Sequence, residues 1–213
     1  MSSLYAIFDI DGVIVDSEQL HFDVLKTLLP EQTKGVTPEE LIGLSLKETL
    51  LSLGIDAKQH EQITIQIVSA YKDQLMPRYL RPGIRSLIQS LIEKHVPFGF
   101  VSTAPRDICL ANLGTLELHL KQPLISGDDI ERTKPHPDPY LAMLQCLGAH
   151  PDQTVVIEDT DLGIKAATAA GIRRVYGWPH ALSNTENYGA AHKVIGSLDE
   201  IDAFDAILNS ITK

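Results

Sequence analysis

Short apolar runs alternate with amphipathic stretches along most of this chain. The apolar runs occupy residues 4–10, 96–101, 123–126, 154–157 and 174–178. Each is too short for a helix and is rich in β-branched or aromatic residues, so each predicts a buried strand.

The amphipathic stretches between these runs predict helices. Apolar side chains recur at three- and four-residue steps over 83–94, 139–147 and 162–170, and Gly171 suits the C-terminal cap of the third stretch. Alternation of strand and helix predicts a Rossmann-like α/β fold, in which helices cover both faces of a parallel sheet. Right-handed crossovers then place the carboxyl ends of all strands at one edge.

The segment 17–80 departs from this alternation. It shows helical periodicity and no convincing strand, with apolar stripes such as Leu20, Val24 and Leu28. A connection of this length far exceeds an ordinary loop between a strand and a helix. We therefore predict a helical cap over 17–80, inserted into an α/β catalytic core formed by 1–16 and 81–213.

The charge balance limits the partners of this chain. Eighteen Lys and Arg against 28 Asp and Glu give a formal net charge of −10, whereas nucleic-acid binding needs a basic face. No apolar run approaches the ~20 residues of a membrane-spanning helix, and the start lacks the pattern of a secretory signal. We expect a cytoplasmic protein, a monomer or weak homodimer, that binds neither nucleic acid nor membrane.

The cysteines also favour a reducing compartment. Cys109 and Cys146 form no CxxC pair, which predicts two reduced thiols rather than a disulfide framework. Both lie in stretches of helical periodicity, so we predict that both are buried by packing.

Carboxylates gather at the ends of two predicted strands. Asp9 and Asp11 are two residues apart, so their side chains share one side of an extended chain, and Gly12 then lets the backbone turn away. Glu158 and Asp159 follow an apolar strand, where buried carboxylates need a compensating cation. Each pair alone also fits a solvated turn or a helix cap.

A hydroxyl and a lysine are predicted near the same edge. Ser102 and Thr103 close the second strand, where a hydroxyl can bind an anionic oxygen or simply cap the helix that begins near Pro105. Lys134 precedes the proline-rich stretch 135–139, which fixes its starting point. A lone lysine is usually a surface residue, but beside acids it can neutralise both them and a phosphate. Oxygen ligands at this edge favour a hard cation such as Mg²⁺.

The joint pattern resembles the haloacid dehalogenase-like phosphohydrolases, in the branch with an inserted helical cap that includes β-phosphoglucomutase-like and phosphoglycolate phosphatase-like enzymes. The resemblance covers essentially the whole chain. It rests on four motifs in order, FDIDGVIVDSE, VST, KPHPDPY and EDTDLGIKAATAAG. It implies Mg²⁺ as the cofactor and a small phosphorylated metabolite as the substrate.

The resemblance also implies a role for each matching residue. Asp9 would be the nucleophile that forms an aspartyl phosphate, and Asp11 would be the general acid and then the general base. Ser102 and Thr103 would bind the transferring phosphoryl group, and Lys134 would pair with Asp9 and phosphate oxygens. The implied metal ligands are Asp9, Asp11 through its backbone carbonyl, Glu158 and Asp159.

The cap distinguishes a phosphatase from a phosphomutase. In β-phosphoglucomutase-like sequences a Gly-x-Ser-Arg pattern supplies an arginine for a second phosphate. Here the pattern begins at Gly43 but has Leu46 at the arginine position, with Lys47 beside it. His21 matches a cap-linker histidine of the mutases, and it equally fits a helix-face residue at the hinge.

We therefore expect a phosphatase that acts on a sugar phosphate, with His21, Gly43 and Lys47 as candidate substrate-binding residues in the cap. A β-phosphoglucomutase-like mutase is the first alternative. A catalytically silent member that binds a ligand or partner in the cap cleft is the second.

Overall fold

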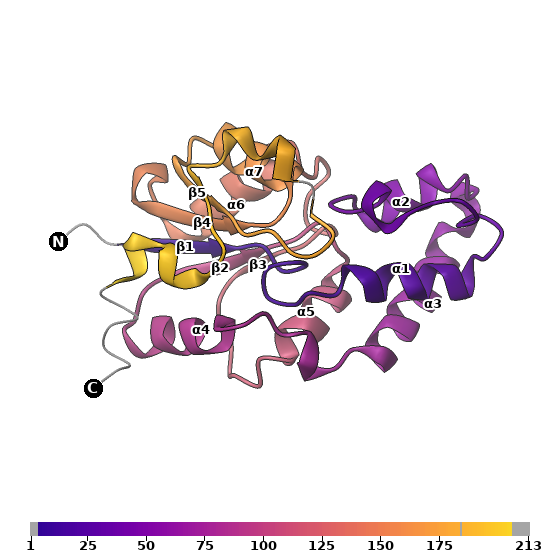
Figure 1. The fold of residues 1–213 in the computed structure, drawn as a ribbon, viewed down its shortest axis with the longest axis horizontal. Coiled ribbons are helices and arrows are strands. Elements are labelled where there is room, and N and C mark those ends of the chain that lie inside the picture. Colours follow the sequence, from indigo (N-terminus) through magenta and orange to yellow (C-terminus); the bar gives the residue numbers. More distant parts are fainter. Residues whose placement is uncertain (1–3, 184, 206–213) are drawn as a thin grey trace.

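Six strands form one parallel sheet in the computed structural model, which describes residues 4–183 and 185–205. The strand order is β3-β2-β1-β4-β5-β6. The central strand β1 (Tyr5–Phe8) lies between β2 (Phe98–Val101) and β4 (Thr154–Glu158) (Figure 1). The outer strands are β3 (Leu124–Ile125), β5 (Arg174–Gly177) and β6 (Lys193–Val194). The predicted α/β fold with a parallel sheet is confirmed.

The edge strand β6 is the part of the sheet that the apolar pattern does not predict. Its two residues are both exposed, and they pair in parallel with the end of β5. A strand this short and this exposed has no apolar run to reveal it, because its position depends on pairing with β5.

Side-chain alternation along the strands supplies a core on each face of the sheet. In β1, Ala6 and Phe8 pack into one layer and Ile7 into the other. The helices α4 (Ile84–Glu93) and α5 (Arg106–Gly114) cover the first face, and α6 (Asp138–Leu147) and α7 (Asp161–Ala169) cover the second (Figure 1). Just beyond α7, Gly171 has a φ of +87°, as its predicted capping position requires.

The chain between β1 and α4 is helical. It contains α1 (Glu18–Leu28), α2 (Leu46–Ser52), α3 (His60–Gln74) and short 3₁₀ turns, and residues 17–80, all of which are described, include no strand. Figure 1 shows this segment beside the sheet rather than on either face.

The two connections of this helical segment run side by side. The backbone N–H of Asp16 donates to the carbonyl of Tyr79 at 2.7 Å, and that of Arg81 donates to the carbonyl of Ile14 at 3.0 Å. The segment therefore leaves and re-enters the sheet at one place. Residues 1–3, 184 and 206–213 of the predicted core lie outside the described residues.

The two cysteines are free, and they differ in burial. Cys109 is buried in α5, as predicted, but Cys146 is exposed on α6. The prediction of burial is wrong for Cys146 because Tyr140, Met143 and Leu144 form the inward face of that helix. In the described part of the chain, no helix is long and apolar enough to cross a membrane.

Candidate active site

The parallel sheet brings the predicted chemical groups to its carboxyl edge. Asp9 follows β1, Ser102 follows β2, and Glu158 ends β4, and all three side chains are buried. The backbone N–H of Asp9 donates to the carbonyl of Ile157 at 3.0 Å, which joins the ends of β1 and β4. Lys134 reaches the same place from the turn before α6 and is also buried.

Lys134 lies between two buried carboxylates. Its Nζ donates to Oδ1 of Asp9 and, at 2.5 Å, to Oε1 of Glu158. Burial alone would lower the pKa of Lys134, but the charges of these two acids and the hydrogen bonds to them raise it above its ordinary value. The lysine is therefore held in its charged form.

Asp9 remains in an electrostatically unfavourable position despite this lysine. Burial raises its pKa well above the ordinary value, the charge of Lys134 opposes that shift, and neighbouring carboxylates add to it. The acids outnumber the lysine at this edge, so a further cation here would lower the pKa of Asp9 and favour its ionised form.

The donors at this edge fit a divalent cation. Asp9, Glu158 and Asp159 each offer an oxygen, and these oxygens lie within 4.8 Å of one another. Both carboxylate oxygens of Asp159 are buried without a hydrogen-bond partner, and burial raises the pKa of this group. Such an arrangement is costly unless a cation contacts the carboxylate. An all-oxygen donor set is the kind that Mg²⁺ binds.

Glu158 differs from Asp159 because its carboxylate is already occupied. Oε1 accepts from Lys134 and from the hydroxyl of Tyr140, and Oε2 accepts from the backbone N–H groups of Asp159 and Thr160 at 3.2 and 3.4 Å. This carboxylate orients Lys134, while Asp159 is the acid left free. Direct ligation of a metal by Glu158 stays a prediction.

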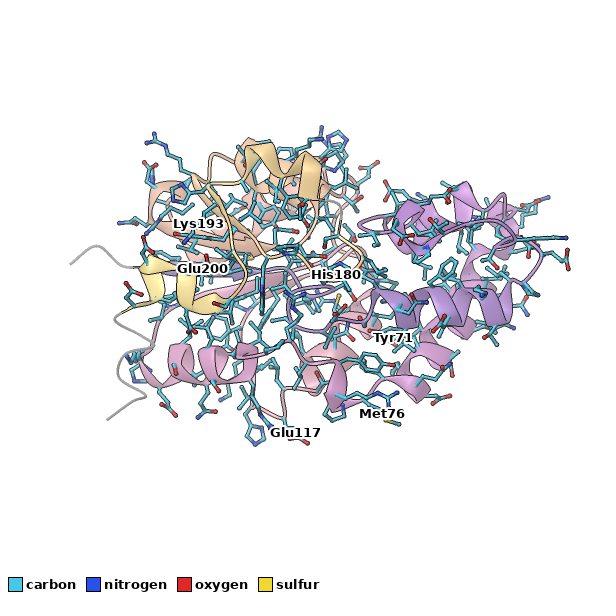
Figure 2. All side chains as sticks on the ribbon, in the orientation of Figure 1. Tyr71, Met76, Glu117, His180, Lys193 and Glu200 are labelled. Atoms are coloured by element: carbon cyan, nitrogen blue, oxygen red, sulfur yellow. The ribbon has the colours of Figure 1, made fainter. Side chains whose placement is uncertain are left out.

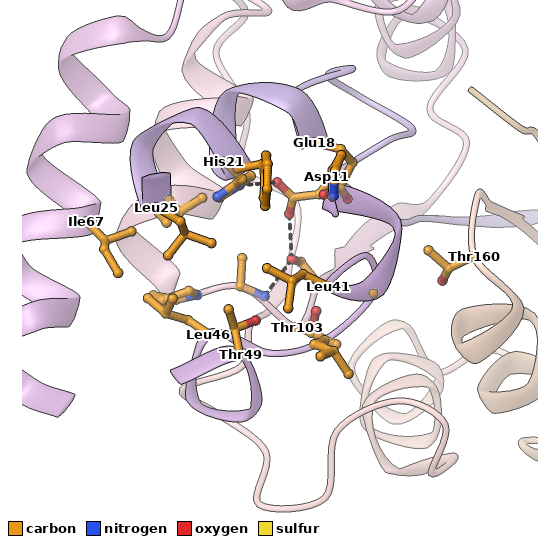
Figure 3. Close-up of a pocket in the computed structure, with 18 of the residues that line it drawn as sticks. Asp11, Glu18, His21, Leu25, Leu41, Leu46, Thr49, Ile67, Thr103 and Thr160 are labelled. Atoms are coloured by element: carbon orange, nitrogen blue, oxygen red, sulfur yellow. Dashed lines mark hydrogen bonds and ion pairs between the residues drawn. The ribbon is translucent and has the colours of Figure 1, made fainter. Parts of the chain in front are cut away.

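Asp11 is turned towards the helical segment and is held by three side chains. Oδ2 accepts from the Ser102 hydroxyl at 3.0 Å, and Oδ1 lies 3.3 Å from His21 Nε2 (Figure 3). Oδ1 also accepts from Asn112 Nδ2 at 2.9 Å. Burial acts to raise the pKa of Asp11, but these contacts and the charges of His21 and Lys134 outweigh it, and the net pKa is lowered. Asp11 is therefore ionised in this arrangement.

Ser102 and Thr103 lie where the sequence predicts a phosphoryl-binding group. The Ser102 hydroxyl donates to Asp11 and accepts the backbone N–H of Ala104 at 2.9 Å, so it also stabilises the turn into α5. Ser102 and Thr103 line one cavity together with Asp9, Asp11 and Lys134.

This cavity, of about 80 Å³, lies between the carboxyl edge and the helical segment (Figure 3). Its wall from 17–80 is mainly apolar, and among the described lining residues this part includes no Lys or Arg. The apolar side chains of that wall are Phe22, Leu25, Pro38, Leu41, Leu44, Leu46 and Ile67. Glu18 also lines the cavity, and burial, with the charges of Asp11 and Asp159, raises its pKa well above the ordinary value.

The three predicted substrate-binding residues of the cap have different positions. His21 lines the cavity and stacks on Tyr71, with ring centroids 4.1 Å apart. Gly43 also lines it, and an added Cβ there would lie 3.3–3.5 Å from the side chains of Leu162 and Thr160. Lys47 is exposed and lines a neighbouring cavity of about 830 Å³, which shares Leu46, Thr103 and Pro105 with the first. The structure therefore does not bring Lys47 to Asp9.

Several polar residues of the site were not predicted. Asn112 bonds Asp11 and accepts from the Tyr71 hydroxyl at 2.7 Å, and Tyr140 bonds Glu158. Asn112 is fully buried, and an asparagine among apolar residues at helical spacing is the sequence signal that could have marked it. His180, which lies against Asp159, has no such signal.

Comparison with known proteins shows which family this chain belongs to and which enzymes it is similar to. Residues 6–176 match the family described as haloacid dehalogenase-like hydrolase. The phosphorylated carbohydrates phosphatase of Thermotoga maritima is 29% identical over 84% of this chain and 86% of its own. Validoxylamine A 7'-phosphate phosphatase of Streptomyces hygroscopicus subsp. limoneus is 30% identical over 78% and 82%.

A solved structure shares the fold. The β-phosphoglucomutase of Clostridium difficile aligns over 100% of both chains with a TM-score of 0.79 at 23% identity. At this identity the likeness concerns the fold alone.

Proposed function

Because this chain belongs to the haloacid dehalogenase-like hydrolase family and is a phosphohydrolase, we propose that it is a Mg²⁺-dependent phosphatase of a small phosphorylated metabolite. The observation that carries the proposal is the buried Asp9–Lys134 pair beside the unpartnered carboxylate of Asp159, at the end of a cavity. A carboxylate nucleophile, a phosphate-binding cation and a metal ligand are thus adjacent.

The first half of the reaction forms an aspartyl phosphate on Asp9. A carboxylate oxygen of Asp9 bonds to phosphorus, the bond to the leaving oxygen breaks, and Asp11 gives that oxygen a proton. Lys134 lies against Asp9, where it can also neutralise phosphoryl oxygens. Bound Mg²⁺ would reduce the repulsion between the carboxylate and the phosphate dianion.

The second half releases inorganic phosphate. Asp11 takes a proton from water, which attacks phosphorus and returns Asp9 as a carboxylate. The lowered pKa of Asp11 suits this base role. A phosphoryl group that takes the Ser102 hydroxyl removes one hydrogen bond that lowers this pKa, which favours the protonated form needed for the first half.

The apolar wall of the cavity favours hydrolysis over phosphoryl exchange. A mutase must hold a second phosphate in the cap, and the described residues of 17–80 that line the cavity offer no Lys or Arg for it. Lys47, the cap lysine that the sequence offers for this role, lines the neighbouring cavity instead. Relatives named as phosphatases of phosphorylated carbohydrates and of validoxylamine A 7'-phosphate support a sugar phosphate as the substrate.

We also propose that 17–80 acts as a cap on the core formed by 1–16 and 81–213. The paired connections at Asp16–Tyr79 and Ile14–Arg81 would serve as its hinge. Closure of such a segment over the substrate would exclude bulk water from the site.

Hydrolysis of p-nitrophenyl phosphate in the presence and absence of Mg²⁺ tests the proposal. We expect Mg²⁺-dependent turnover that Asp9→Asn abolishes, whereas Asp73→Asn, an exposed aspartate of α3, keeps it. With glucose 1-phosphate and a bisphosphate activator, we expect released phosphate rather than an isomerised sugar phosphate. If the wild-type protein hydrolyses no member of a broad panel of phosphate esters with Mg²⁺, the proposed phosphatase activity is excluded.

A further inference from the structure

A histidine outside the predicted motifs lies against the candidate metal carboxylate. His180 belongs to the loop after β5 (Figure 2). Its side chain is 0% exposed. Its Nε2 is 3.1 Å from Oδ2 of Asp159. The pair lies within hydrogen-bond distance but lacks hydrogen-bond alignment, so both groups remain without a bonded partner. A buried donor and a buried acceptor this close complement one another.

The hydrogen bonding of the ring assigns its proton. The backbone N–H of Leu182 donates to Nδ1 of His180 at 3.4 Å. A ring nitrogen that accepts a hydrogen bond carries no proton, so a neutral ring has its proton on Nε2. The protonated nitrogen is therefore the one that faces Asp159.

The loop that carries His180 is attached to the end of β4. The backbone N–H of Trp178 donates to the carbonyl of Glu158 at 2.6 Å, and the Ser183 hydroxyl donates to the carbonyl of Asp159 at 3.4 Å. One end of the loop is thus bonded to the backbone of Glu158 and the other to the backbone of Asp159.

Arg81 fastens the same loop from the connection of the helical segment. Its guanidinium lies 3.9 Å from the centre of the Trp178 ring, and Nη2 donates to the carbonyl of Pro179 at 3.0 Å. Nδ1 of His180 lies 3.6 Å from Oδ1 of Asp16 on the other connection, which is beyond hydrogen-bond distance. The loop of His180 is thereby held from the connection that carries Arg81.

We propose that His180 is a positioning residue for the metal site. When the cation is bound, the Nε2–H of His180 would hold one oxygen of Asp159, so that the other oxygen faces the cation. Donors behind a metal ligand fix its orientation, and their loss typically reduces metal affinity 10- to 100-fold. The inference rests on the proposed function in taking the cation as Mg²⁺.

Titration calorimetry with Mg²⁺ alone, without substrate, tests this role. We expect His180→Ala to raise the Kd for Mg²⁺ roughly 10- to 100-fold. Glutamine carries its amide N–H about as far from the backbone as Nε2, whereas asparagine reaches only as far as Nδ1. His180→Gln should therefore stay close to wild type, and His180→Asn should resemble His180→Ala. His119→Gln, at an exposed histidine, is the matched control and should bind as wild type.

A role in packing alone predicts a different result. It would give the glutamine and asparagine variants the same Kd, and that outcome would overturn the inference, as would a folded His180→Ala protein with wild-type affinity. If His180→Ala fails to fold, the Kd values of His180→Gln and His180→Asn for Mg²⁺ decide between the two roles. A wild-type protein that binds no Mg²⁺ would instead overturn the proposed metal site, and this inference with it.

Discussion

Lys134 donates a hydrogen bond to Asp9 across 125 positions of sequence, and both side chains are buried. The same ammonium also contacts Glu158, which leaves Asp159 as the nearby acid without a lysine. A nucleophile, a fixed cation and an unsatisfied carboxylate thus occupy one edge of the sheet. The following predictions test separate parts of this arrangement.

Removal of Lys134 should cost more stability than removal of an exposed lysine. Lys134→Ala leaves two buried carboxylates uncompensated, a change that costs about 3–5 kcal/mol. Lys165→Ala breaks an exposed pair with Asp161 on one helix and should cost about 0.3–0.5 kcal/mol. Urea unfolding in EDTA measures both. Equal losses would contradict a charge-compensating role for Lys134.

Asp159→Asn should stabilise the Mg²⁺-free protein near neutral pH. Burial raises the pKa of Asp159 from its ordinary value of 3.8. The stability given by its protonated form is therefore complete below that ordinary value and is lost as the pH rises through the raised pKa. The asparagine amide carries no charge at any pH, so the variant does not lose this stability. Near pH 7 in EDTA, we expect the variant's free energy of unfolding to exceed that of wild type by about 1–3 kcal/mol.

Mg²⁺ and acid should each remove this difference. Wild type gains stability with Mg²⁺ concentration because only the folded state binds the ion, whereas Asp159→Asn should gain little. At about pH 4 the two proteins should converge, since Asp159 is then protonated. If the variant is less stable than wild type in EDTA near pH 7, the free carboxylate of Asp159 does not destabilise the protein and the prediction is wrong.

Gly12→Ala should disrupt the metal carboxylate directly. Gly12 has a φ of +81°, and an added Cβ would lie 2.0 Å from Oδ2 of Asp159. Gly35 has the same φ of +81° with nothing within 4 Å of an added Cβ. Gly35→Ala should therefore lose only the backbone term of about 1–2 kcal/mol, while Gly12→Ala also loses Mg²⁺ binding and turnover. Similar Mg²⁺ affinities in the two variants would rule out the close approach.

Leu46→Arg should change the preference for the number of phosphates on the substrate. Leu46 lines the cavity, and a guanidinium there would supply the cation that the apolar wall lacks. We expect kcat/KM for a sugar bisphosphate, relative to its monophosphate, to rise roughly tenfold, which corresponds to about 1.4 kcal/mol. Leu51→Arg, at a 54% exposed position of α2 outside that cavity, should leave the ratio unchanged. No rise with Leu46→Arg would indicate that the wall does not contact the leaving group.

The apolar pattern was sufficient to predict strands β1 to β5 and to place the motif residues at their ends. A strand ends where its apolar run meets acids, and parallel strands end at one edge, so Asp9, Ser102 and Glu158 could be placed together from sequence. The pattern failed where local sequence carries no packing information. The exposed strand β6 and the exposed Cys146 depend on which neighbours cover them.

The polar network around the site could not be predicted from the sequence either. Asn112 reaches Asp11 across 101 positions, and His180 reaches Asp159 from a loop after another strand. Such contacts require the tertiary path of the chain, which periodicity does not contain. Lys47 shows the converse: its sequence neighbour Leu46 lines both cavities, whereas Lys47 lines only the one that does not contain Asp9.

The phosphorylation of Asp9 is the central claim, and chemical trapping tests it most directly. Asp11→Asn, mixed with Mg²⁺ and p-nitrophenyl phosphate, whose leaving group needs no proton, should still form the aspartyl phosphate but hydrolyse it slowly, so that it accumulates. Borohydride reduces an acyl phosphate to an alcohol, so peptide mass spectrometry should find homoserine at position 9, and none in Asp9→Asn. Turnover by wild type with no trapped modification at Asp9, or with the trapped group on another residue, would contradict the account.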